Sequence, residues 1–307
     1  FMRQAVARFN VSLTVVATGS SLGLAARVSS LLGCRLVAVE EKTFPDGEKY
    51  VRVPEKVGAL AVVVHSTYPP QDERLIQLLL TIDAVEHAGA EKVVVAAPYL
   101  AYARQDKRFL EGEPVSIGVV LKAVEAAGAD ALVTVDLHRP SSLDEWLKIP
   151  HLNIIPIGPI ARYFQGRLRD PLVLAPDKGA LHRAQAMAQV LGTAYDYLEK
   201  SRDRVTGEVA VAPKTVSAAG KDVLIVDDII STGGTLIAAA KSMKAAGARR
   251  VYAACTHALL VSGALDKLYA AGIEEVVATD TIPSPVSRVS VAEQLATAIK
   301  ELIGSLL

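Results

Sequence analysis

The chain has 307 residues, 51% of them hydrophobic, and its 33 basic side chains are balanced by 33 acidic ones. This length predicts about two domains at a prior of ~150 residues each, and the apolar fraction lets each domain bury its own core. The neutral charge argues against a sequence-independent nucleic-acid binder, and the lack of an apolar run of about 18 residues argues against a membrane span.

Short apolar runs alternate with Ala-rich helical stretches along the chain. Continuous apolar runs of this length are typical of strands buried on both faces. Because helices fit between most of these strands, we expect an α/β fold of mostly parallel sheets flanked by helices. The predicted strands are Leu13–Ala17, Arg35–Val39, Ala61–His65, Lys92–Ala96, Ala131–Asp136, Leu172–Ala175, Ala194–Leu198, Asp222–Val226, Arg250–Ala254 and Glu275–Thr279.

Two spacings indicate an internal duplication. Ala17 and Ala175 each precede a polar loop and a helix, and Gly89 and Gly247 follow the next helices at the same separation. An Ala-Gly pair closes these helices and two others just before a strand, which fits a left-handed glycine after the helix end. We therefore expect two tandem domains of one fold.

Pro150 and Pro156 interrupt the pattern between the halves. We place the domains at residues 1–147 and 148–287, followed by a helix within 288–307. Ser290 and Glu293 form a capping-box pattern at its start, and its apolar stripe could pack on either domain.

The stretch VLIVDDIISTGGT (Val223–Thr235) carries the clearest chemistry. A buried strand is expected to end at Asp227 and Asp228, before a loop and a helix over Leu236–Ala246. A glycine-rich loop at a helix start binds anions through backbone N–H groups, whereas two carboxylates suit sugar hydroxyls or a metal. The stretch lacks the P-loop lysine and the GxGxxG pattern. The candidate sugar-phosphate ligands are Asp227, Asp228, Ser231, Thr232, Gly233, Gly234 and Thr235.

This stretch resembles the phosphoribosyl-binding motif shared by type I phosphoribosyltransferases and ribose-phosphate pyrophosphokinases. The resemblance implies that both domains are type I phosphoribosyltransferase-like. The motif alone leaves open whether the chain makes or consumes 5-phosphoribosyl 1-pyrophosphate.

Two first-half segments resemble the ATP-binding parts of the pyrophosphokinases. PYLAYARQDKRF is similar to the family's PYxxYxRQD segment, which implies that Arg104, Gln105 and Asp106 contact ATP; a guanidinium can bind phosphate oxygens in a fork. FPDGE resembles the element that forms the adenine pocket of a neighbouring subunit, through Phe44, Asp46 and Glu48. This implies a homo-oligomer, at least a dimer, with a shared adenine pocket.

Two further elements imply a magnesium site. VDLH ends in His138, which in the family binds Mg²⁺-ATP, and PDKGALHRA supplies Asp177 as its partner. Because Mg²⁺ prefers oxygen ligands, His138 is expected near the metal. By the same resemblance, the loop of Asp177, Lys178, Gly179 and Ala180 holds pyrophosphate.

The charged loop LEKSRDRVTGEV resembles the family's catalytic loop, with Lys200 and Arg202 matching its Lys-x-Arg pair. The implied reaction transfers the β,γ-pyrophosphoryl group of MgATP to the 1-hydroxyl of ribose 5-phosphate and releases AMP. The two cations would stabilise charge on the transferred group.

The form of this loop, and RPSSLDEW after VDLH in place of a Gln- and Phe-rich stretch, favour an archaeal-type member. Both features put a hexamer with allosteric control in doubt. The two distant cysteines, Cys34 and Cys255, fit a reduced cytoplasmic protein. The alternatives are a type I phosphoribosyltransferase and an inactive regulatory relative, although the Lys-x-Arg loop and the aspartate pair are intact.

Overall fold

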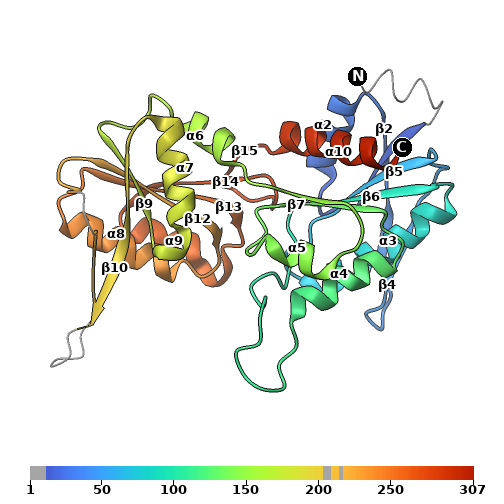
Figure 1. Ribbon diagram of the computed structural model, residues 1–307, viewed down its shortest axis with the longest axis horizontal. Helices are drawn as coiled ribbons and strands as arrows, with labels where there is room; N and C mark the ends of the chain where they lie inside the picture. Colours follow the sequence, from blue (N-terminus) through green and yellow to red (C-terminus); the bar gives the residue numbers. More distant parts are fainter. Residues whose placement is uncertain (1–11, 203–208, 214–216) are drawn as a thin grey trace. The chain divides into compact units, whose positions relative to one another are not determined.

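The computed structural model describes residues 12–202, 209–213 and 217–307 (Figure 1). The chain forms two compact units. The first contains the chain up to Ile155 with Thr281–Pro283 and Ser290–Leu307, and the second contains Pro156–Asp280 with Ser284–Val289. The division therefore falls after β8, whereas the sequence-based boundary lies after residue 147.

The first unit is built on a six-stranded sheet of order β2-β1-β5-β6-β7-β8, in which all neighbours are parallel. Its strands are β1 (Leu13–Ala17), β2 (Arg35–Ala38), β5 (Leu60–Val64), β6 (Lys92–Ala97), β7 (Ala131–Val135) and β8 (His151–Ile154). All but β8 follow the predicted strands to within one residue at each end. The βα prediction for this half is confirmed.

Helices cover both faces of this sheet, because alternate strand residues point to opposite sides. Val15, Val62 and Val94 belong to a core with α2 and α10, whereas Val16, Val63 and Val95 belong to a core with α3 and α4. The helices are α2 (Leu22–Leu32), α3 (Gln71–His87), α4 (Ser116–Ala126), α5 (Ser141–Trp146) and α10 (Ala292–Leu306).

The last helix, α10, packs beside α2 at the other end of the sequence (Figure 1). Its stripe of Leu295, Ile299 and Leu302 is buried, as the sequence predicts. The capping box is wrong: Val291 is the N-cap and no side chain caps the helix. Ser290 Oγ accepts the Ala292 N–H at 3.2 Å.

The second unit repeats the strand order of the first. Its sheet has the order β11-β10-β9-β12-β13-β14-β15. Without β11, this order corresponds strand by strand to β2-β1-β5-β6-β7-β8 of the first unit. Only β11 is additional, as an antiparallel edge strand. The strands are β9 (Pro171–Ala175), β10 (Ala194–Arg202), β11 (Val209–Pro213), β12 (Asp222–Ile230), β13 (Arg250–Ala258), β14 (Ile273–Thr279) and β15 (Ser287–Val289). The shared order supports the duplication.

Helices also cover both faces of the second sheet. One face is covered by α6 (Ile157–Phe164) and α7 (Leu181–Leu191). The other face is covered by α8 (Gly234–Ala245) and α9 (Ala264–Ala270). The glycines that close α3, α4, α8 and α9 all have positive φ, which confirms the predicted helix ends. No helix among the described residues is long and apolar enough to span a bilayer.

The strand prediction misses a hairpin in each unit. In the first, β3 (Glu40–Thr43) and β4 (Lys49–Arg52) form a separate two-stranded sheet. In the second, β10 runs on to Arg202 and pairs with β11. The residues of β3 are all exposed, so the segment has no apolar pattern.

The contact between α4 and α5 gives a prediction about stability. A Cβ on Gly118 would lie 2.6 Å from two ring carbons of Trp146, so Gly118→Ala should destabilise the fold by about 1–3 kcal/mol. A Cβ on Gly23, in α2, meets nothing within 4 Å. Gly23→Ala should therefore stabilise the protein, by up to about 1 kcal/mol. Urea unfolding of both variants checks the sign, and a stabilising Gly118→Ala would contradict the packing.

Candidate functional site

In the second unit, the sugar-phosphate stretch lies at the carboxyl end of the central strand β12. The strand continues through Asp227 and Asp228 to Ile230, so the predicted strand end at the aspartates is wrong. The loop is short, because α8 begins at Gly234 rather than at residue 236.

The loop is held by its backbone. The N–H groups of Leu259 and Leu260 donate to Ile230 O, and that of Val261 donates to Ser231 O. Gly233 has φ of 79° and lies against the side chain of Leu268. A side chain at this position would be strained, so the glycine lets the loop enter α8 with its N–H groups at the helix start. Thr232, Gly234 and Thr235 are exposed there.

The two aspartates form a crowded acidic pair. Burial raises the pKa of Asp227 from its ordinary value of 3.8 to about 7, with contributions from the charge and hydrogen bonding of Asp228 and from the charge of Asp177. Arg183, on α7, ion-pairs with Asp228 across 3.8 Å, and both side chains are less than a tenth exposed. Asp228 is therefore paired with Arg183, whereas the raised pKa of Asp227 favours its protonated form up to about pH 7.

Asp177 precedes a single turn of 3₁₀ helix, η1 (Lys178–Ala180). Its Oδ1 accepts the N–H groups of Gly179 at 2.8 Å and of Ala180 at 3.3 Å. The conformation of the loop predicted to hold pyrophosphate is thus stabilised by hydrogen bonds to its own carboxylate. The η1 turn also packs against β12, so the loop lies close to the strand that carries the aspartate pair.

The predicted catalytic residues lie on the hairpin of this unit. The backbones of Lys200 and Arg202 belong to β10 and are paired with Val211 and Val209 of β11. Their side chains lie outside the described part of the chain.

In the first unit, the loop after β6 contains Arg104–Asp106, which we call the RQD loop. Thr67 holds its start: the Thr67 hydroxyl donates to Tyr99 O at 3.2 Å and accepts from Ala101 N–H at 2.8 Å. Further along, Ser116 Oγ donates to Gln105 Oε1. Thr67 follows the carboxyl end of β5, and Ser116 begins α4. These two anchors therefore place the loop at the carboxyl ends of the strands.

The last residue of the RQD loop, Asp106, is ion-paired with Arg139, whose Nε lies 3.2 Å from Asp106 Oδ2. Arg139 directly follows His138, and His138 is exposed after β7. The structure thus joins the RQD loop to the VDLH turn, two motifs that are distant in the sequence.

The FPDGE element forms the tip of the β3–β4 hairpin. Phe44 is 39% exposed, and its ring meets Tyr50 edge-on at 6.0 Å. Lys42 Nζ lies 4.7 Å from the Phe44 centroid and 4.4 Å from that of Tyr50. The N–H of Glu48 donates to Asp46 Oδ1. The tip therefore presents an aromatic ring and carboxylates to the outside.

The sequence does not predict a buried polar network that lies beneath the loops of the first unit. Thr18 Oγ1 lies 2.5 Å from His65 Nδ1, and His65 Nε2 lies 2.7 Å from the carbonyl of Arg74. Nε2–H must donate to that carbonyl, so Nδ1 accepts from Thr18. Burial lowers the pKa of His65 to about 4. The one signal in the sequence is a histidine that ends an apolar run.

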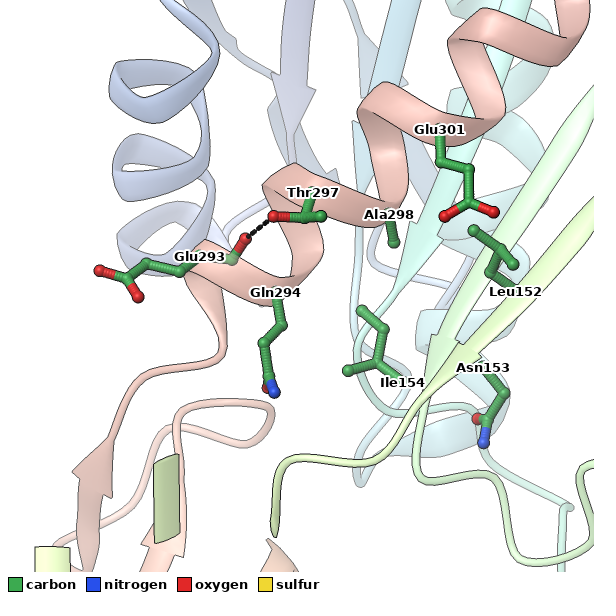
Figure 2. Close-up of a pocket in the computed structure, with 8 residues that line it drawn as sticks. All are labelled: Leu152, Asn153, Ile154, Glu293, Gln294, Thr297, Ala298 and Glu301. Carbon is green, nitrogen blue, oxygen red and sulfur yellow. Dashed lines mark hydrogen bonds between the residues drawn. The ribbon is translucent and has the colours of Figure 1, made fainter. Parts of the chain in front are cut away.

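A depression elsewhere in the first unit, between α10 and β8, has a volume of about 390 Å³ (Figure 2). Its lining includes Glu293, Gln294 and Glu301 and no basic residue. An acidic lining repels phosphate, so this depression is a poor match for ATP or a sugar phosphate.

Comparisons with known proteins agree on one family. A model of the N-terminal domain of ribose phosphate pyrophosphokinase matches residues 13–128, and a phosphoribosyl transferase domain model matches residues 152–288. The ribose-phosphate pyrophosphokinase of Methanopyrus kandleri is 45% identical over 95% of this chain and 100% of its own length. That of Pyrococcus furiosus is 48% identical over 84% and 90%.

A solved structure matches nearly the whole chain. The phosphoribosylpyrophosphate synthetase from Mycobacterium smegmatis superposes with a TM-score of 0.84 at 28% identity, over 96% of this chain and 99% of that one. The likeness therefore covers both units.

The raised pKa of Asp227 gives a pH-dependent prediction. Between about pH 4 and pH 7 the folded protein keeps a proton that the unfolded chain releases, so this group lowers the free energy of unfolding as pH rises. Asp227→Asn should stabilise the fold at pH 8, by up to about 4 kcal/mol, and have little effect near pH 4.

Denaturant unfolding at both pH values checks this expectation. Asp266→Asn, at an exposed carboxylate of α9, serves as the matched control and should show no such difference. Equal effects of Asp227→Asn at both pH values would show that the pKa of Asp227 is not raised in the folded protein.

Proposed function

Because the chain belongs to the ribose-phosphate pyrophosphokinase family, we propose that it transfers the β,γ-pyrophosphoryl group of MgATP to the 1-hydroxyl of ribose 5-phosphate. The products are 5-phosphoribosyl 1-pyrophosphate and AMP, for use in nucleotide biosynthesis. The observation that carries this proposal is the coexistence of the aspartate pair with the short loop before α8 and the RQD loop in one chain.

Ribose 5-phosphate suits the end of β12. The 5-phosphate would accept the N–H groups of Gly233, Gly234 and Thr235 at the start of α8, where the helix dipole favours negative charge. Ser231 and Thr232 add hydroxyl donors. A carboxylate repels phosphate, so Asp227 and Asp228 would bind the 2- and 3-hydroxyls. A protonated Asp227 can donate to one hydroxyl while Asp228 accepts from another.

ATP suits the first-unit motifs. Arg104 is exposed, and its guanidinium would bind phosphate oxygens, with Gln105 and Asp106 beside it. Phe44 would stack on adenine, and Asp46 and Glu48 would accept from the adenine amino group. The hairpin tip presents these groups outward, which supports a pocket completed by a second copy and a homo-oligomer of at least two chains.

Magnesium would accompany ATP. The described residues contain no ready-made group of three His, Cys, Asp or Glu side chains for a metal, which fits an ion that keeps its waters and binds one or two carboxylates plus phosphate oxygens. Asp177 has an oxygen, Oδ2, that takes no part in its two backbone bonds. We propose Asp177 as a ligand and His138 as a residue near the ion. When bound, Mg²⁺ neutralises phosphate charge.

The transfer needs position and charge more than an acid or base. The 1-hydroxyl oxygen attacks the β-phosphorus, the bond from that phosphorus to the α,β-bridging oxygen breaks, and AMP leaves with that oxygen while the hydroxyl proton is released. Lys200 and Arg202 would stabilise the charge that develops on the bridging and β-phosphoryl oxygens. Asp177–Ala180 would then hold the pyrophosphate part of the product.

Incubation with ribose 5-phosphate and MgATP should produce one AMP for each phosphoribosyl pyrophosphate, because the two phosphoryl groups move together. Mass spectrometry with ATP that carries oxygen-18 in its β-phosphoryl group should place the label in the sugar product. A phosphoribosyltransferase would instead consume added phosphoribosyl pyrophosphate in the presence of a base. An inactive relative would do neither.

Lys200→Ala should lower kcat by about 10²–10³, equivalent to roughly 3–4 kcal/mol in the barrier, and leave the Kd of ribose 5-phosphate nearly unchanged. The physical reason is that the ammonium acts on charge that is present only in the transition state. Steady-state kinetics and calorimetric titration measure the two quantities. Equal losses in both would contradict the catalytic role.

A further inference from the structure

The side chain of Arg139 ties the turn after β7 to the RQD loop. Besides its contact with Asp106, its Nε lies 3.4 Å from Ser142 Oγ, and its Nη2 ion-pairs with Glu145 of α5. The side chains of Arg139 and Asp106 are 36% and 14% exposed. Arg139 therefore contacts α5 and the RQD loop at the same time.

The contact lies at the last residue of the RQD loop. Thr67 anchors the loop at Tyr99 and Ala101, and Ser116 anchors Gln105. After Asp106, the residues from Lys107 to Leu110 are exposed. The Arg139–Asp106 ion pair therefore anchors the RQD loop at the point where the chain becomes exposed.

The charges explain why such an anchor is needed. A carboxylate next to Arg104 would repel the phosphates that Arg104 is proposed to bind, and it would compete for the guanidinium. Arg139 takes up the Asp106 carboxylate instead. Among the described residues, Arg104 has no ion pair or hydrogen bond to protein, so its donors face solvent.

We propose that Arg139 is a positioning residue for ATP binding, which fixes the RQD loop to the turn of His138 through its ion pair with Asp106. This inference rests on the proposed function of the first-unit motifs. Arg139 acts through Asp106 and is not a catalytic residue. Its effect falls on MgATP affinity and leaves ribose 5-phosphate affinity alone, because the second substrate is bound by a loop of the other unit.

Calorimetric titration of Arg139→Ala with MgATP, in the absence of ribose 5-phosphate, tests the proposal. The Kd for MgATP should rise by about tenfold, the loss expected of one charge-assisted hydrogen bond, and the Kd for ribose 5-phosphate should stay within about twofold. At saturating MgATP, kcat should also stay within about threefold. Arg139→Lys should restore part of the affinity, because it keeps the charge but not the fork.

Arg35→Ala is the matched control. Arg35 lies in the same unit and forms an exposed ion pair with Glu55 at 3.1 Å, far along the sheet from the RQD loop in strand order. It should leave the MgATP Kd unchanged. If Arg139→Ala binds MgATP as tightly as Arg35→Ala does, the positioning role is wrong.

A double-mutant cycle tests the pairing itself. Asp106→Asn and Arg139→Ala should each weaken MgATP binding, and the double variant should be no weaker than the worse single variant, because both remove one interaction. Independent, multiplying losses would overturn the proposal. Asp106→Asn and Arg139→Lys carry the test if Arg139→Ala does not fold, as judged by its circular dichroism.

The two proposals fail differently. If the unsubstituted protein forms no AMP from ribose 5-phosphate and MgATP, the proposed function is wrong. If it forms AMP but the Arg139 variants keep full MgATP affinity, only the positioning role is wrong.

Discussion

Repulsion between two neighbouring carboxylates governs the second unit's site. Asp227 and Asp228 sit side by side at the end of a central strand, where burial and mutual charge raise the pKa of Asp227 to about 7. Arg183 offsets this repulsion from α7, and it is itself only 5% exposed. A buried guanidinium is stable only when it is paired, so the arginine and the aspartates depend on one another. A ligand that brings hydroxyl groups or a cation would relieve the remaining repulsion, which supports the proposed role of this pair in sugar binding.

The duplication explains how one fold can carry two different sets of candidate ligand-binding residues. Both sheets have the same order for six strands, and each unit has a hairpin near its second strand: β3–β4 follows β2 in the first, whereas β10 itself pairs with β11 in the second. The FPDGE tip and the Lys-x-Arg pair thus occupy similar places in the two copies. At the strand that follows, the copies differ, because β5 leads into His65 and a serine and threonine network, whereas β12 leads into the aspartates. The first copy uses this edge to brace a loop, and the second places there the aspartates that we propose to bind ribose 5-phosphate.

Most strands could be predicted from the sequence because burial on both faces leaves a continuous apolar run, as in β5 and β6. The same reasoning fails wherever burial is partial. The residues of β3 are all exposed, and β8 is only half-buried, so neither has the expected pattern. The prediction also ended β12 too early, because two aspartates look like a loop when their partner Arg183 is not yet known to be near. Motifs located the candidate residues of both substrates, but motif spacing says nothing of contacts such as Arg139–Asp106, which only the fold creates.

The two arginines of the candidate sites differ in their surroundings, and this difference separates their roles. Arg183 is buried against Asp228, so removing it leaves an uncompensated buried charge, an effect that reaches several kcal/mol and falls on folding itself. Arg139 is 36% exposed, and ion pairs at such positions contribute only about 0–1 kcal/mol to stability. A weak contribution to folding does not make the contact unimportant, because a shift of a loop by a fraction of an ångström changes ligand affinity without unfolding anything. Arg183 therefore makes the aspartate site possible, whereas Arg139 acts on how accurately an already folded loop is placed.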